Sequence, residues 1–465
     1  MRNDDHAARA DELRRAGEDA EAETRWQDAA AAYEQCLSLM ADAPAEGSPG
    51  REAGGGDEAA LLTALGRCYW NLSEARTAWR FLRRAISLYQ QLGDAAGQSR
   101  ETIEITRIWG PQERHKAMAQ DALDALAAAG ADEPYLRARL LLRMRWFDDD
   151  ADPGSGAKFE EAMAIGERYG FEDVLAARIE QEAWAATDAG RMDEGNALRE
   201  RAHAIYAKTK MYDGAAQMLR GSGFNSMGFG LLDAGYELAE RAFDYASSVN
   251  ILFTAQLALM DMAAVPYARG EFKRCEALLA RSPGTSDFRI DLYSMWMVDA
   301  RGDAQGALRL MVDPARGGNA TTAMGQLHAA SAGVLFRAGK RDAARQAMDA
   351  WATVERGWEG WEEDVALESP TLIECLLELG DASLHRRVYD AFAKVDERGT
   401  VPVRFSTLQG RALAPVRGGL ALKLGLLDEA ESLYRDGLAW CERERCAADA
   451  ALCRAGLSAV AAARG

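Results

Sequence analysis

The chain has 465 residues, a hydrophobic content of 48% and a formal net charge of −18. That much apolar material is enough for a continuous core and excludes a disordered chain. The acidic balance argues against a nucleic-acid or anionic-membrane partner. No apolar run reaches the roughly 18 residues of a membrane span, and residues 1–6 are not followed by the apolar core of a secretory signal. These features predict a cytoplasmic protein of the bacterial type.

The first predicted element is a helical hairpin at residues 1–40. Bulky and small side chains alternate there at the spacing of a helical hairpin, at Leu13, Gly17, Ala29 and Tyr33. Residues 41–58 follow, with five glycines and two prolines in a short run. This composition predicts a flexible, irregular and exposed linker.

The clearest pattern is at residues 59–92. Gly66, Tyr69, Ala78, Leu82 and Ala85 follow one another at spacings that place small residues at a helix–helix contact. If Gly66 is position 8 of a 34-residue repeat, Ala78 and Ala85 take positions 20 and 27. This pattern resembles the tetratricopeptide repeat, and the resemblance implies stacked antiparallel helix pairs. Ala78 and Ala85 are then expected to be buried.

Weaker copies of the same pattern cover the rest of the chain. Glycines recur at positions 270, 302, 339, 380 and 425. Each is predicted to end the first helix of a hairpin by adopting a positive φ. We therefore predict an all-α fold, a right-handed α-solenoid of about eleven hairpins with no sheet. Its main part is residues 59–446, and residues 447–465 form a C-terminal capping helix.

The sequence contains no convincing catalytic or metal-binding motif. Asp148, Asp150 and Asp152 have the spacing of a calcium loop, but Pro153 stands where such a loop needs glycine. The five histidines lie far apart, and His115 and His385 fall at packing positions of the repeat. No phosphate-binding loop or nucleophile motif is present. We expect no enzyme activity, no cofactor and no metal.

The first helix of each tetratricopeptide hairpin presents positions 2, 5, 9, 12 and 13 to a concave face. Aromatic and polar residues at or beside these positions are candidates for partner binding. They are Arg67, Trp70, Asn71, Glu180, Trp184, Phe224, Asn225, Tyr267, Trp296 and Asp299. At least two of Trp70, Trp184 and Trp296 are expected on this face. The alternative is that these rings belong to the core.

Two arginine clusters interrupt the acidic sequence, at residues 67–84 and 137–145. Either they form salt bridges with neighbouring repeats or they receive an acidic partner segment. Residues 437–446 also resemble repeats in the sensor arms of bacterial signalling ATPases, which implies a stand-alone arm or adaptor.

The leading hypothesis is a non-enzymatic scaffold that binds a protein or peptide on its concave face. The alternatives are a regulatory sensor that encloses a small molecule or signalling peptide, and an enzyme built on a helical array.

Overall fold

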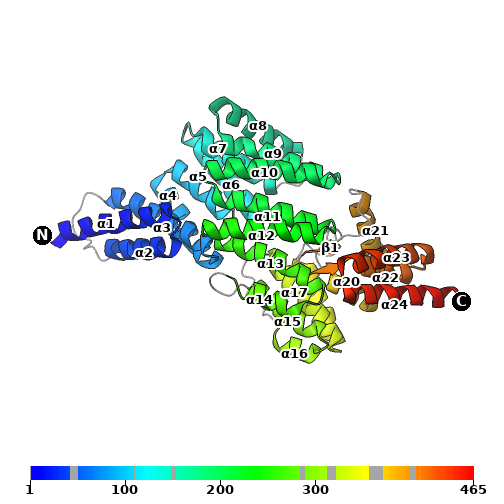
Figure 1. Cartoon of the computed structure of the whole chain (residues 1–465). Coiled ribbons are helices and arrows are strands. Elements are labelled where there is room, and N and C mark those ends of the chain that lie inside the picture. The colour runs from blue at the N-terminus through cyan, green and yellow to red at the C-terminus, as the bar shows by residue number, and fades with distance from the viewer. Residues whose placement is uncertain are drawn as a thin grey trace. The chain divides into compact units, whose positions relative to one another are not determined.

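The computed structural model describes residues 2–41, 51–108, 112–147, 153–282, 288–311, 321–354, 370–397, 405–407 and 409–465. Within these ranges the chain forms 23 helices and one two-stranded sheet (Figure 1). The fold is an all-α helical-repeat solenoid, as predicted. The helices follow one another as eleven successive pairs and a final single helix.

The helices of the first six pairs are α1 (Arg2–Ala22), α2 (Trp26–Ala41), α3 (Arg51–Asn71), α4 (Ala75–Leu92), α5 (Ala95–Ile105), α6 (Gln112–Ala128), α7 (Pro134–Phe147), α8 (Pro153–Tyr169), α9 (Glu172–Asp188), α10 (Met192–Lys208), α11 (Tyr212–Gly228) and α12 (Leu232–Ser248). The later helices are α13 (Leu252–Ala268), α14 (Phe272–Leu279), α15 (Phe288–Ala300), α16 (Ala304–Arg309), α17 (Thr321–Arg337), α18 (Arg341–Val354), α20 (Pro370–Leu379), α21 (Ala382–Glu397), α22 (Ala414–Lys423), α23 (Leu427–Glu444) and α24 (Ala447–Arg464).

The chain divides into two compact units. Unit 1 comprises residues 1–179, 205–212 and 246–253, and unit 2 comprises residues 180–204, 213–245 and 254–465. In unit 1, α1 packs on α2, α3 on α4, α5 on α6, and α7 on α8. In unit 2, α17 packs on α18, α22 on α23, and α23 on α24.

Close helix contacts in the hairpins depend on glycine. A Cβ built on Gly66 of α3 would lie 2.4 Å from Cγ of Leu82 on α4. The same separation along the sequence recurs where Gly17 faces Tyr33 and where Gly418 faces Tyr434. Ala78 and Ala85 are both fully buried, as predicted. Small residues on one helix therefore make room for a bulky side chain on its partner.

The turns between the middle helices recur at a constant spacing. Gly170, Gly190, Gly230 and Gly270 have positive φ, and so does Lys210 between them. Each of the six helices from α8 to α13 is 17 residues long. Two such helices with their turns make a hairpin that is longer than the tetratricopeptide frame. That frame therefore describes packing within a hairpin better than the distance between hairpins.

Most of the glycine turns form as predicted. Gly302, Gly339 and Gly425 have positive φ, like Gly270. Gly380 does not belong to the positive-φ glycines, so the prediction is wrong for its conformation, although α20 does end beside it. In the turn after α9, the N–H of Gly190 bonds to Thr187 and the N–H of Arg191 to Ala186. This is the Schellman pattern, which requires a left-handed residue.

Two predictions about backbone structure need correction. The predicted linker at 41–58 is too long, because α2 includes Ala41 and α3 begins at Arg51. Residues 42–50, and the aspartates of the calcium-like loop at 148–152, lie outside the described residues. A small antiparallel hairpin of β1 (Phe405–Ser406) and β2 (Arg411–Ala412) also breaks the expectation of no sheet.

Predicted packing residues are in the core. All seven cysteines are buried and free. His115 is buried beside Trp79, and burial lowers the pKa of its imidazole to about 4. His385 is buried too, with Nε2 2.9 Å from the carbonyl oxygen of Leu376. Among the described residues, no helix has the length and apolar composition needed to cross a membrane.

Candidate functional site

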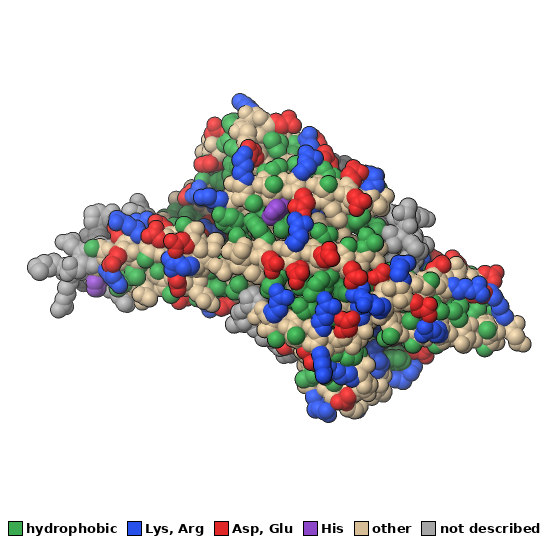
Figure 2. Space-filling view, viewed as in Figure 1, with side chains coloured by type: hydrophobic (Ala, Val, Ile, Leu, Met, Phe, Trp, Pro, Cys, Tyr) green, Lys and Arg blue, Asp and Glu red, His purple; other side chains and the backbone are tan. Residues whose placement is uncertain are grey.

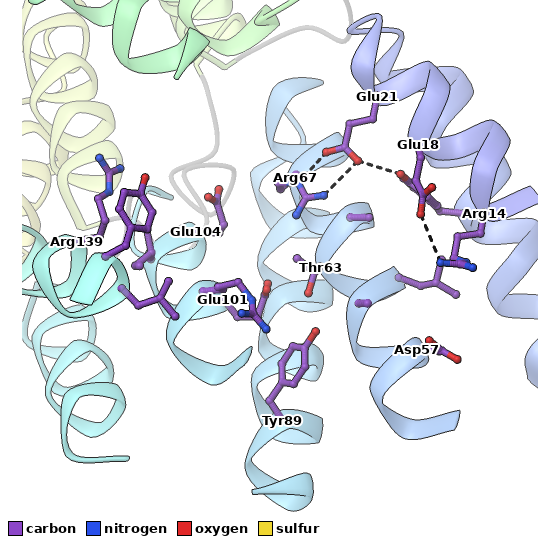
Figure 3. A pocket seen from close by; sticks show the side chains of 18 of the residues that line it. Arg14, Glu18, Glu21, Asp57, Thr63, Arg67, Tyr89, Glu101, Glu104 and Arg139 are labelled. Carbon is purple, nitrogen blue, oxygen red and sulfur yellow. Dashed lines mark hydrogen bonds and ion pairs between the residues drawn. The ribbon is translucent and has the colours of Figure 1, made fainter. Parts of the chain in front are cut away.

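A cleft in unit 1 is the strongest candidate for a binding site. Its volume is about 470 Å³, and it is lined mainly by α1, α3, α5 and α7, the first helices of four successive hairpins. Tyr33 of α2, Tyr89 of α4 and Tyr135 of α7 contribute phenol rings. We call this site the charged cleft, because its lining includes Arg14, Glu18, Glu21, Asp57, Arg67, Arg100, Glu101, Glu104 and Arg139 (Figure 3).

The repeat frame accounts for which side chains line the charged cleft. With Gly66 at position 8, Thr63 and Arg67 are at positions 5 and 9 of α3. With Gly17 at position 8, the lining residues of α1 are at positions 5, 9 and 12 (Arg14, Glu18 and Glu21). These positions face away from the second helix of their hairpin, so hairpin packing leaves their side chains available.

Arg67 and Glu21 join the first two hairpins. Nε of Arg67 donates to Oε1 of Glu21 at 2.8 Å, and Nη2 donates to Oε2 at 3.2 Å. The Tyr33 hydroxyl donates to the same Oε2 at 2.9 Å. The carboxylate of Glu21 thus receives three hydrogen bonds and neutralises the guanidinium, as Figure 3 shows.

The other end of the charged cleft is organised by α7. Nη1 of Arg139 donates to Oδ2 of Asp173 at 3.2 Å, and the Tyr135 hydroxyl donates to the same oxygen at 2.7 Å. On α5, Glu104 accepts a 2.9 Å hydrogen bond from Nη1 of Arg107. Burial raises the pKa of Glu104, but the charges of Arg107 and other nearby arginines outweigh burial and lower it overall. Glu104 is therefore ionised.

Glu101 differs from the other carboxyl groups. Its side chain lines the charged cleft but is only 1% exposed. The hydroxyl of Thr63, which donates to the carbonyl oxygen of Ala59, lies beside the carboxyl group, and Oε2 has no hydrogen-bond partner among the described residues. Burial raises the pKa of Glu101 to about 8, and the neighbouring charge of Glu104 adds to the increase. A buried acceptor without a partner costs free energy, which a ligand donor can recover.

The structure separates the predicted site residues of α3. Arg67 lines the charged cleft. Trp70 is only 6% exposed, with its ring centroid 4.6 Å from that of Phe253, and Asn71 is also buried. The prediction that Trp70 is exposed is wrong, because the segment containing Phe253 covers position 12.

The predicted residues of α9 and α11 belong to unit 2. Trp184 is 40% exposed, and the guanidinium of Arg199 lies 5.1 Å from its ring centroid. Glu180 is half-buried on the same helix. Phe224 and Asn225 are half-buried on α11, and Arg220 lies over the Phe224 ring.

The remaining three predicted residues have packing or pairing roles. Trp296 is 6% exposed and makes an edge contact with Tyr293, so its predicted exposure is also wrong. Tyr267 packs edge-on against Tyr293 as well. Asp299 accepts a hydrogen bond from Nε of Arg337 at 2.6 Å. Inner-face positions in this region are used for contacts between helices.

Arginines of both clusters pair within unit 1. Nε of Arg137 donates to Glu161 at 2.7 Å, and Arg84 pairs with Glu58. On the face shown in Figure 2, basic and acidic side chains are interspersed. For these residues the structure favours the first alternative, salt bridges between neighbouring helices, and not an unpaired basic surface for an acidic partner.

Sequence reasoning missed most of the charged cleft. Glu101 follows Arg67 by one length of the repeat frame and so has the same place in the repeat. Applying positions 5, 9 and 12 to the first hairpin as well would have selected Arg14, Glu18 and Glu21. The sequence analysis favoured tryptophan and phenylalanine at inner-face positions, whereas this cleft is lined by charged residues and tyrosines.

Comparisons with known proteins identify no relative of the chain. No family model matches the chain, and no curated protein matches it. Similar solved structures include yeast Tom70 (10% identity, 96% of this chain and 95% of that chain, TM-score 0.27) and the P58(IPK) TPR domain (10%, 97% and 97%, 0.26). The Cut9–Hcn1 hetero-tetramer of the APC/C is a third (13%, 97% and 97%, 0.31).

The architecture of the chain follows from the packing of its own hairpins. Their contacts between a glycine of the first helix and a bulky side chain of the second are the packing that the repeat pattern predicts. The chain is a helical-repeat solenoid whose hairpins resemble the tetratricopeptide pattern in this packing. Its similarity to the sensor arms of bacterial signalling ATPases stays a prediction.

Proposed function

We propose that the chain is a non-enzymatic adaptor that binds a peptide segment of a protein partner in the charged cleft. The observation that carries this proposal is the lining of the cleft by the first helices of four successive hairpins. A groove that crosses several repeats offers an extended segment several contact points in a row. We propose a cytoplasmic role without direct contact to nucleic acid.

The lining supports recognition of a polar segment. Glu21 and Asp173 hold Arg67 and Arg139 in place, so these guanidinium groups are oriented before a partner arrives. The phenol rings of Tyr33, Tyr89 and Tyr135 add apolar area beside the charges. Such a mixture favours a peptide with both charged and apolar side chains.

A substitution that fills the cleft tests the proposal. Ala60 of α3 lines the charged cleft and is exposed, so Ala60→Trp occupies part of its space without disturbing the core. Ala31 of α2 is also exposed but does not belong to the lining. Ala31→Trp is therefore a matched control for the added indole.

The three immobilised full-length proteins are exposed to lysate of the source cell, and bound proteins are compared by quantitative mass spectrometry. A partner of the cleft is retained by the wild type and by Ala31→Trp, and falls at least about tenfold with Ala60→Trp. If all three proteins retain the same set, binding occurs elsewhere and the proposal is wrong. Equal thermal stability of the two variants shows that folding is not the cause.

A further inference from the structure

The charged cleft contains one acceptor that its own residues leave without a donor. Glu101 lines the cleft and is only 1% exposed, and its buried Oε2 has no hydrogen-bond partner among the described residues. We propose that the cleft binds an alkylammonium group, such as a lysine side chain, against Oε2 of Glu101. This inference rests on the proposed function, because it names the chemical group that the partner inserts.

One cation matches the formal charge of the lining when Glu101 is ionised. Four arginines and five carboxyl groups line the cleft, so its lining carries a formal charge of −1 when all of them are ionised. Arg67 is neutralised by Glu21, and Arg139 by Asp173. Glu104 is paired with Arg107, a neighbour outside the lining. An ammonium group at Glu101 therefore balances the charge of the cleft.

The geometry favours an ammonium over a guanidinium or a calcium ion. One carboxyl oxygen of Glu101, Oε2, is buried without a hydrogen-bond partner among the described residues. A guanidinium fork is best matched by both oxygens of a carboxylate, whereas an ammonium is a compact donor that suits one. Calcium requires six or more oxygen ligands. The phenol ring of Tyr89, which lines the same cleft, adds a face suited to a cation.

Binding of such a cation depends on the ionisation of Glu101. The charged and titratable groups around it are Arg67 of α3, Tyr89 of α4, and Arg100 and Glu104 of α5. Since burial raises the pKa of Glu101 to about 8, the free cleft holds this carboxyl group mostly protonated at pH 7. An alkylammonium ligand must displace that proton. Its affinity is then about tenfold weaker at pH 7 than at pH 9.

Isothermal titration of the full-length chain with Nα-acetyl-lysine-N-methylamide tests the inference, and the norleucine analogue is the apolar control. We expect binding of the lysine compound alone, strengthening about tenfold from pH 7 to pH 9. Glu101→Gln should abolish this binding. Glu237→Gln, the same change at an exposed position of α12 outside the lining of the cleft, should leave it within about twofold.

Cadaverine, a free diamine, distinguishes a peptide lysine from a small amine. If the lysine compound binds at least as well as cadaverine, a peptide side chain is the ligand, whereas exclusive binding of cadaverine overturns that choice of source. Equal binding of the norleucine analogue, or binding that persists in Glu101→Gln, overturns the ammonium site. If Glu101→Gln does not fold, the pH dependence of the wild type decides, and a flat profile from pH 7 to pH 9 contradicts the inference.

The outcome is separable from that of the proposed function. A captured partner that binds the cleft equally well after its lysines are changed to norleucine leaves the adaptor role intact and refutes the ammonium site. If the lysine compound binds but Ala60→Trp loses no partner, the ammonium site is supported and the adaptor role is refuted.

Discussion

The glycine contact between α3 and α4 leads to a prediction whose sign is unusual for a helix. In an exposed helix, Gly→Ala stabilises by about 1 kcal/mol, because alanine has the higher helix propensity. At Gly66 the new methyl group would lie 2.4 Å from both Cγ and Cδ2 of the buried Leu82. Overpacking of this kind costs about 1–3 kcal/mol. We therefore expect Gly66→Ala to destabilise this hairpin by about 1–2 kcal/mol.

The same helix contains the control. A Cβ on Gly56 of α3 would meet no atom within 4 Å, so Gly56→Ala should stabilise by about 0.5–1 kcal/mol. Hydrogen exchange of the α3 and α4 amides measures local opening, which suits a repeat array better than one global transition. Protection should fall about 5–30-fold in Gly66→Ala and rise in Gly56→Ala. Changes of the same sign in both variants would refute the packing argument.

Four further substitutions test the core and the site. Trp70→Ala should lower the free energy of unfolding by about 3–5 kcal/mol, because the residue is only 6% exposed. Trp184, which is 40% exposed, should cost about 1 kcal/mol or less when changed to alanine. Equal losses in thermal unfolding would contradict the assignment of Trp70 to the core and Trp184 to the surface. Ala78→Leu should cost about 1–3 kcal/mol by overpacking a fully buried position, and an unchanged melting temperature would count against the repeat frame. Glu101 contributes stability below pH 4.5 that is lost as the pH rises through about 8, since burial raises its pKa. Glu101→Gln should therefore be more stable than wild type at pH 7, by up to about 3 kcal/mol, with the difference vanishing near pH 4 in denaturant titrations.

Much of the fold could be predicted because its packing rule is local in sequence. A small residue on the first helix and a bulky residue at the matching place on the second must meet when the two form one hairpin, so the pattern of Gly66 and Leu82 is readable without a structure. The helix-ending glycines are similarly local, since a left-handed residue is needed wherever a short turn reverses the chain. The end of the linker, where α3 begins, was harder to predict from the sequence. Gly54, Gly55 and Gly56 disfavour a helix on propensity, but α3 includes them, and packing of the rest of the helix outweighs that preference.

The exposure of single side chains was harder to predict, because it depends on segments far away in sequence. Trp70 has the expected place on α3, but Phe253, which comes many helices later in the chain, covers it. Trp184 has an equivalent aromatic side chain and stays exposed. The repeat frame gives the direction of a side chain from its hairpin. It does not say what approaches from that direction.

The charged cleft shows why charge was the better guide to open positions. A tryptophan at an inner position gains free energy when any apolar segment covers it, so aromatic inner residues tend to become core. An arginine or glutamate at the same position loses hydration when covered, and so favours a solvent-filled cleft unless a partner of opposite charge is close. In α1 and α3 the exception applies to Glu21 and Arg67, which pair with each other and are only partly exposed. Glu101 is buried with Oε2 unpartnered among the described residues, and burial raises the pKa of its carboxyl group to about 8, so that the proposed ammonium ligand pairs with the ionised form. Because the proposed cation would contact this carboxyl group directly, Glu101→Gln is the first substitution to make.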